Sequence, residues 1–290
     1  MCPGVQGAPV SLIESFVPGG SQVIEMGQRY VDFFAHQLQS TLLTAVLIAV
    51  FTFAELVWPV SHRATVRGRA MNILIGLIVS VFAFLCTLLL AWVAQLVWRD
   101  GLIGLVFHNW RQPGLLGLAL SVFVYGATWD FFQYWFHRWQ HESPALWPTH
   151  RLHHSDSAVN TTTALRRSIL ELLLIFVFIL IPTVIVAGVD EIAAPIAFAI
   201  FYGWGFFNHA NIRLSLGPLT PVFSGPHWHR LHHGIDPEYR DRNYAAYFPI
   251  IDLIFGTYRE PRKDEYPATG VTDAVATAHP LQDCIHPTRR

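Results

Sequence analysis

Long apolar runs separated by short polar segments dominate this chain of 290 residues. A helix of about 20 mainly apolar residues crosses a bilayer. Five runs approach or exceed that length: Thr41–Trp58, Met71–Trp98, Gly114–Phe136, Ser168–Ala187 (with an internal Pro182) and Ile192–Phe207. The pattern predicts an all-α, multi-pass membrane protein with four to five transmembrane helices.

The polar stretches divide the chain into three parts. We expect residues 1–40 to form an N-terminal segment, interfacial over residues 30–39, with no cleaved signal peptide because no apolar stretch follows a basic start. We expect residues 41–260 to form a single membrane domain. Residues 261–290 are polar, contain prolines and predict a surface tail.

Composition supports the membrane assignment. Only 13% of the residues are charged and 52% are hydrophobic, whereas a soluble domain has about 25% charged residues. The formal net charge of -1 gives no sign of a nucleic-acid partner. The three cysteines lie far apart and fit no cysteine-rich metal site, so a metal here would be held by imidazole and carboxylate groups.

Basic residues near the ends of the runs predict the orientation. The turn between the fourth and fifth runs is acidic, at Asp190 and Glu191. Arginines instead follow the first, third and fifth runs: Arg63, Arg67, Arg69, Arg138, Arg151, Arg166, Arg167, Arg213, Arg230, Arg240 and Arg242. Cytoplasmic loops carry such an excess. We therefore expect all these loops on the cytoplasmic side.

Histidines cluster in the same loops: ten of the fifteen fall within residues 137–233. Residues three or four apart share a helix face, so three clusters each present two or three imidazoles: His137 and His141; His150, His153 and His154; His229, His232 and His233. One ion takes about four ligands. Eight or more imidazoles predict a two-metal centre in a cytoplasmic helical cap, but imidazole does not choose between Fe, Zn, Cu and Ni.

Two further histidines are weaker candidates. His209 ends the fifth run, where an ionisable residue is costly unless it faces a site, so we favour it as a ligand over a capping role. His227 stands two residues before His229, and alternate residues point apart on a helix. It can reach a metal only from an irregular turn at Gly225-Pro226.

Three carboxylates are candidates for supporting the ligands. Asp130 lies two helical turns before His137 and can accept the second ring N–H of a ligand, or it can be a buried aspartate paired with Tyr or Trp. Glu142 and Asp156 follow the first two clusters, and each either supports a ligand or is solvated.

Sequence motifs of several other enzyme classes are absent from this sequence. The chain has no His-Glu-x-x-His, so a zinc protease is disfavoured, and no nucleophile elbow or dinucleotide fingerprint. Alternatives that remain open are a histidine-rich surface helix and a metal-binding membrane protein without turnover, either a transporter or a structural zinc protein. Transport sites need polar groups near the bilayer midplane, whereas these histidines follow the ends of the runs.

The three clusters with spans between them resemble the fatty acid hydroxylase/sterol desaturase superfamily. The resemblance covers roughly Asp130 to Arg259 and includes Asn208-His209 and Asp252 to Thr257. Residues Asn160 to Ser168 and Asp241 to Tyr244 are most similar to its alkylglycerol monooxygenase-like bacterial branch.

This resemblance implies two non-haem Fe ions that activate O2 and hydroxylate or desaturate a lipid C–H bond, with Zn an alternative in isolated protein. It implies a catalytic core at about residues 115–260, with the eight clustered histidines as ligands and His209 as a ninth. It also implies a fatty acyl, ether lipid or sterol substrate and a separate electron donor: a cytochrome b5-like protein, a ferredoxin or a reduced pterin. We expect the bacterial inner membrane, or the endoplasmic reticulum in a eukaryote.

Overall fold

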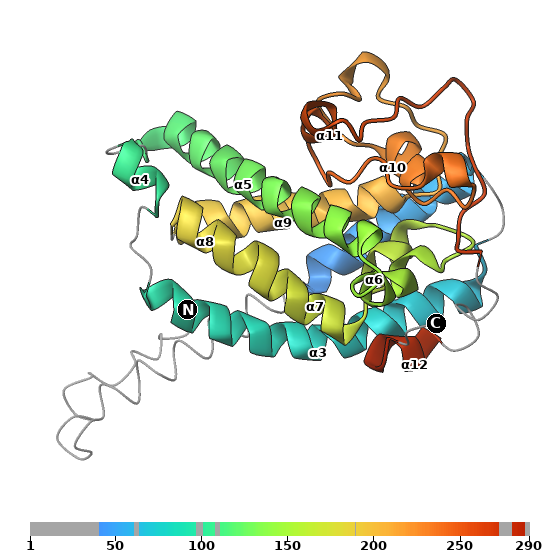
Figure 1. Cartoon of the computed structure of the whole chain (residues 1–290), viewed down its shortest axis with the longest axis horizontal. Helices are drawn as coiled ribbons and strands as arrows, with labels where there is room; N and C mark the ends of the chain where they lie inside the picture. Colours follow the sequence, from blue (N-terminus) through green and yellow to red (C-terminus); the bar gives the residue numbers. More distant parts are fainter. Residues whose placement is uncertain are drawn as a thin grey trace, which may run out of the picture. The chain divides into compact units, whose positions relative to one another are not determined.

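The computed structural model describes residues 41–60, 64–96, 101–107, 111–188, 190–272 and 280–287. The expected N-terminal segment 1–40 lies outside these ranges. The described part is built from helices and loops, with isolated β-bridges at Pro59–Ile212 and Gly234–Thr269 in place of strands. The all-α prediction is therefore confirmed (Figure 1).

The helices after Thr41–Val57 follow one another with short loops. They are α3 (Val66–Leu96), α4 (Ile103–Val106), α5 (Gly114–Glu142), α6 (Trp147–His154), η1 (Thr161–Leu165), α7 (Ile169–Ile175), η2 (Phe176–Leu180), α8 (Ile181–Ala187), α9 (Ala193–His209), η3 (Gly217–Leu219), α10 (Pro226–His232), η4 (Pro237–Tyr239), α11 (Ile250–Phe255) and α12 (Pro280–Ile285).

Three of the described helices are long and apolar enough to cross a membrane: Val66–Cys86, Gly114–Glu142 and Ile169–Ala187. The helix Thr41–Val57 is apolar but shorter, and α9 has 17 residues. All five predicted runs are thus helical, and the chain is a multi-pass helical membrane protein. Its third helix extends six residues past the predicted Phe136, because the polar turn that carries His137 and His141 continues the same helix.

Pro182 leaves a local irregularity in the fourth run. The run is continuous from α7 through η2 to α8, but η2 is a π-helical turn that ends two residues before Pro182. Proline has no N–H to donate to the preceding turn, and a wider turn accommodates such an interruption. The helix therefore crosses without a break.

The packing of α5 against α8 and α9 places the ends of these helices beside the short helices α6 and α10. At the α5–α9 contact, a Cβ on Gly126 would lie 1.8 Å from Cζ of Phe201, so only glycine allows this approach. On the other side, α3 packs against η1 and α7. In Figure 1, α6 and α10 lie at the end where α5 and α9 stop.

Part of the segment 261–290, for which the polar composition predicted a surface tail, packs against the helices: α12 contacts α3, α6 and α7. Leu47–Arg290 form one compact unit. Cys284 is fully buried beside Ile75 and Leu152, and Leu281 packs on the same cluster. Leu281 and Cys284 are three residues apart and so share the buried face of α12.

Candidate metal centre

Four elements carry the nine predicted ligand histidines. His137 and His141 lie in the last turns of α5, and His209 is the last residue of α9. The helices α6 and α10, each with a proline in its first turn, carry the others, except that His233 directly follows α10 as its C-terminal cap. Proline is favoured there because the first N–H groups of a helix have no partner to lose. These short helices place their histidines against the ends of the longer ones.

The structure gathers the nine imidazoles into two groups, and in each group one ring nitrogen per histidine lies within 4.8 Å of all the others. The first group, here called the five-histidine group, contains His137, His141, His150, His154 and His232. The second, the four-histidine group, contains His153, His209, His229 and His233.

Hydrogen bonds fix the tautomers of five of these histidines. A carbonyl or carboxylate only accepts, so an Nδ1 bonded to one carries the proton and leaves a lone pair on Nε2. The Nδ1 atoms of His137, His153, His209 and His232 donate to backbone carbonyls, and that of His150 donates to Glu171: His137 to Tyr244 (2.7 Å), His153 to Arg166 (3.2 Å), His209 to Gly205 (2.7 Å), His232 to Arg242 (2.8 Å) and His150 to Glu171 Oε1 (2.8 Å).

The fixed tautomers bring lone pairs face to face. The Nε2 atoms of His137 and His150 are 2.9 Å apart, and those of His153 and His209 are 3.0 Å apart. Two facing lone pairs repel unless a cation stands between them. Nitrogens that share one ion at about 2.1 Å each can stand about 3 Å apart. Both groups therefore fit a bound metal ion.

Burial adds a second sign of a metal site. The Nε2 atoms of His141, His154 and His232 are buried without a hydrogen-bond partner. A buried polar atom without a partner costs free energy, and a metal ion in the group would provide one. All nine except His141 are buried, so a histidine-rich surface helix does not describe this arrangement.

Burial also keeps the imidazoles neutral, the form that binds metal. Outside the membrane-spanning helices, desolvation lowers the pKa of His150, His153, His154, His229 and His233 well below the usual value, and the neighbouring histidines lower it further. Desolvation lowers the pKa of His232 to about 4, against the bond to the Arg242 carbonyl, which raises it.

These shifts predict an unusual pH dependence of metal binding. Protons displace a metal from a histidine only near or below the pKa of that histidine. The pKa of His232 is about 4, so we expect the affinity for Zn²⁺ to stay nearly constant from about pH 7.5 to 5.5 and to fall toward pH 4. Titration of the detergent-purified protein against a competing chelator measures this, and a decline centred near the usual histidine pKa of about 6.5 would contradict it.

Glu171 is a carboxylate that hydrogen-bonds to a histidine of the site, whereas Asp241 lies farther from His141, at 3.9 Å. The sequence did not single out Glu171 for that role. It is fully buried, and its Oε1 accepts from His150 Nδ1 (2.8 Å) and from Arg167 Nη1 (3.2 Å). Ser168 caps the same turn by accepting from the Glu171 N–H. The available signal was a carboxylate within an apolar run, which is costly without a partner.

Replacing Glu171 with Gln is expected to weaken metal binding in the five-histidine group about 10- to 100-fold, the usual effect of losing an acceptor behind a ligand histidine. The amide can still accept, but it no longer favours the charge that the ring acquires on a metal. Chelator competition measures the affinity. The matched control is Glu191→Gln, which changes an exposed glutamate before α9. Equal metal affinities of the two variants would refute the role of Glu171 in supporting His150.

Asp130 does not accept from a ligand ring as the sequence suggested. Its carboxylate accepts from the backbone N–H groups of Ala246 (2.7 Å), Tyr247 (3.1 Å) and Phe248 (2.7 Å). Asp252 likewise accepts from the backbone N–H groups of Tyr244 and Ala245, the two residues before Ala246. The two aspartates hold the loop 244–248, whose Tyr244 carbonyl orients His137.

The remaining candidates lie outside the two groups. Glu142 pairs with Arg138 (2.8 Å) one turn earlier on α5. Asp156 accepts from Asn72, Ala158 and Thr163, and so ties α3 to the loop before η1. His227 bonds through Nε2 to the Glu265 carbonyl (2.8 Å) and stacks on Tyr266, because it points away from His229 on α10. The structure therefore gives none of these three side chains contact with a ligand histidine.

The histidine groups lie in the part of the chain that matches a known family. The family model "Fatty acid hydroxylase" matches residues 122–257. This segment contains all nine histidines of the two groups. Over this segment the chain is similar to the fatty acid hydroxylase family. No solved structure matches the chain.

Relatives similar to part of this chain include proteins named as a monooxygenase and a lipid hydroxylase. Alkylglycerol monooxygenase of Homo sapiens is 34% identical over 157 residues, which is 54% of this chain and 34% of the relative. Alkylglycerol monooxygenase of Xenopus tropicalis is 37% identical over 153 residues, 53% of this chain and 33% of the relative. Ornithine lipid hydroxylase OlsE of Rhizobium tropici is 28% identical over 177 residues, 59% of this chain and 52% of the relative. The chain thus spans a third to a half of the length of these relatives.

Proposed function

We propose that this chain is a membrane-bound, non-haem di-iron oxygenase that hydroxylates a lipid C–H bond. The observation that carries the proposal is the pairing of unprotonated Nε2 atoms in two adjacent buried groups. Nine nitrogen ligands without cysteine suit two ions such as iron. Bound iron would supply the activation of O2, with electrons from an external donor.

The chain's own residues would hold and shield that centre. The five-histidine and four-histidine groups provide the ligands, and His153 and His154, adjacent on α6, belong to different groups. Glu171 and four backbone carbonyls keep Nδ1 protonated, so that Nε2 faces the ion. The burial of the imidazoles excludes water, which limits side reactions of an activated oxygen species.

The substrate class is proposed from the relatives. They are named for alkylglycerols, ornithine lipids and methylsterols, so we propose an ether lipid, fatty acyl or sterol substrate. The reductant would be a cytochrome b5-like protein, a ferredoxin or a reduced pterin. The arginine bias supports a site on the cytoplasmic side of the membrane. We propose the bacterial inner membrane, or the endoplasmic reticulum in a eukaryote.

The test combines metal content with product analysis. We expect the purified protein to hold about two iron ions per chain, one for each group. We expect cells that overproduce it to convert a lipid to a product heavier by one oxygen atom, with ¹⁸O appearing in that product under ¹⁸O2. Bound zinc with no such product would favour a structural zinc protein. Metal flux in proteoliposomes would favour a transporter.

A further inference from the structure

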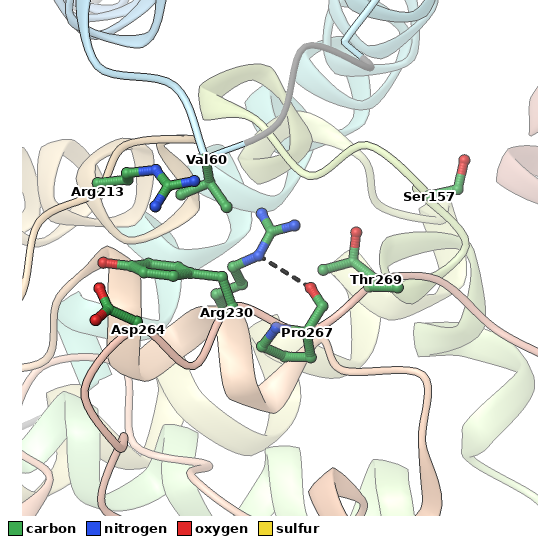
Figure 2. A pocket seen from close by; sticks show the side chains of 9 residues that line it. Val60, Ser157, Arg213, Arg230, Asp264, Pro267 and Thr269 are labelled. Atoms are coloured by element: carbon green, nitrogen blue, oxygen red, sulfur yellow. Dashed lines mark hydrogen bonds between the residues drawn. The ribbon is translucent and has the colours of Figure 1, made fainter.

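A cavity of about 370 Å³ lies apart from the two histidine groups. Figure 2 shows the side chains around it, which come from five separate places in the sequence. They are Val60, Ser157, Arg213, Arg230, Asp264, Tyr266, Pro267, Ala268 and Thr269. A cavity of a few hundred Å³ is large enough for a small molecule.

The cavity lies where two apolar helices end. Val60 follows the helix Thr41–Val57, and Arg213 follows α9. The two segments are joined by the Val60 N–H to the Asn211 carbonyl (3.1 Å) and by the Arg213 N–H to the Trp58 carbonyl (3.1 Å). In a membrane protein, the ends of apolar helices lie at the level of the lipid headgroups.

Arg230 contributes a buried positive charge to this cavity. Arg230 is only 8% exposed to solvent. Its Nε donates to the Pro267 carbonyl (3.1 Å), drawn in Figure 2, and its Nη1 donates to Asn211 Oδ1 (3.4 Å). Both acceptors are neutral, and Nη2 has no hydrogen-bond partner among the described residues.

The other charged groups of the lining leave an excess of positive charge. Arg213 adds a second guanidinium, which lies 5.5 Å from the centre of the Tyr266 ring. Asp264 is the one carboxylate among the lining residues, and it is exposed to solvent. A buried cation is costly without an opposite charge, so an anion in the cavity would stabilise Arg230.

We propose that the cavity lined by Arg213 and Arg230 binds the phosphate group of a phosphate ester. Guanidinium groups bind phosphate through paired hydrogen bonds. A phospholipid headgroup and a soluble phosphate ester offer the same chemistry. The position beside two apolar helix ends favours the lipid, and Arg230 directly follows His229 of the four-histidine group. Binding needs neither metal nor turnover.

The experiment measures ligand binding to the full chain in detergent, by calorimetry and by the shift of the unfolding temperature. The probes are inorganic phosphate and dihexanoyl phosphatidic acid, and dihexanoyl glycerol serves as the uncharged analogue. We expect both phosphate probes to bind and the glycerol to have no effect. Phosphatidic acid binding at least tenfold tighter than phosphate identifies a lipid headgroup as the source, and equal affinities identify a soluble ester.

Arginine variants decide whether the cavity is the site. We expect Arg230→Gln and Arg213→Gln each to weaken phosphate binding at least tenfold. Lys263→Gln removes a positive charge from the same segment outside the lining and should leave binding unchanged. Arg213 is exposed, so its variant remains informative if Arg230→Gln does not fold. Absence of binding by the unmodified protein, or unchanged binding in Arg213→Gln, overturns the proposal. Metal content, measured in parallel, tests the oxygenase proposal separately.

Discussion

Replacing His229 with alanine is expected to remove one of two metal ions and to abolish oxygenation. His229 Nε2 lies 3.1 Å from that of His209 and 3.2 Å from that of His233, so its imidazole contacts two other members of the four-histidine group. Its loss leaves three ligands, whereas a protein-held ion commonly has four. The five-histidine group keeps all its members.

We therefore expect the metal content of His229→Ala to fall from about two ions per chain to about one. Turnover should fall at least ~100-fold, beyond the loss seen when only an outer partner of a ligand is removed. Metal analysis of the purified variant gives the first value, and mass spectrometry of the lipid product gives the second.

His227 provides a matched control on the same helix. It is also buried, but its Nε2 bonds to the Glu265 carbonyl and its ring stacks on Tyr266. His227→Ala removes an imidazole from α10 without touching either group, so both metal ions should remain. If His227→Ala lost metal and His229→Ala did not, the division into two groups would be wrong.

Among the substitutions considered for this protein, Asp130→Ala is expected to cause the largest loss of stability. Asp130 is fully buried, and its carboxylate accepts from three consecutive backbone N–H groups, those of residues 246–248. A buried donor left without a partner costs about 1–3 kcal/mol. We expect the free energy of unfolding to drop by about 3–5 kcal/mol, near the upper end for single substitutions.

The same change should disturb the metal site, because the loop 244–248 carries the carbonyl that orients His137. Unfolding by SDS in mixed micelles measures the stability. Asp130→Asn keeps one acceptor and should lose less. Glu142→Gln, on the same helix, breaks only the partly exposed pair with Arg138 and should change stability by less than about 0.5 kcal/mol. If Asp130→Ala and Glu142→Gln lowered the free energy of unfolding by a similar amount, the loop would not depend on Asp130.

The sequence predicted the membrane helices and the clustering of the candidate ligand histidines because both depend on local patterns. A run of apolar residues is helical in a bilayer, since every backbone group must find its partner within the segment. Histidines three and four apart share a helix face wherever the helix lies. The family match over residues 122–257 agrees with the resemblance drawn from these residues.

The sequence did not predict how the histidines divide between two groups. His150 and His154 belong to one group, while His153, on the same helix, belongs to the other. Likewise His232 lies apart from His229 and His233. Successive helical residues are turned by about 100°, so His153 and His154 point to opposite sides of one face. Which side meets which partner depends on where α5, α9 and α10 pack.

The supporting groups also required the tertiary structure. Glu171 lies 21 residues from His150, and Asp130 lies more than a hundred residues from the loop that it holds. Spacing along the chain carries no information about such contacts. By itself, the sequence determined an all-α membrane protein with nine candidate ligands. The packing of the helix ends decided how those ligands pair, which tautomers they hold and which carboxylate supports them, because each of these depends on contacts between distant segments.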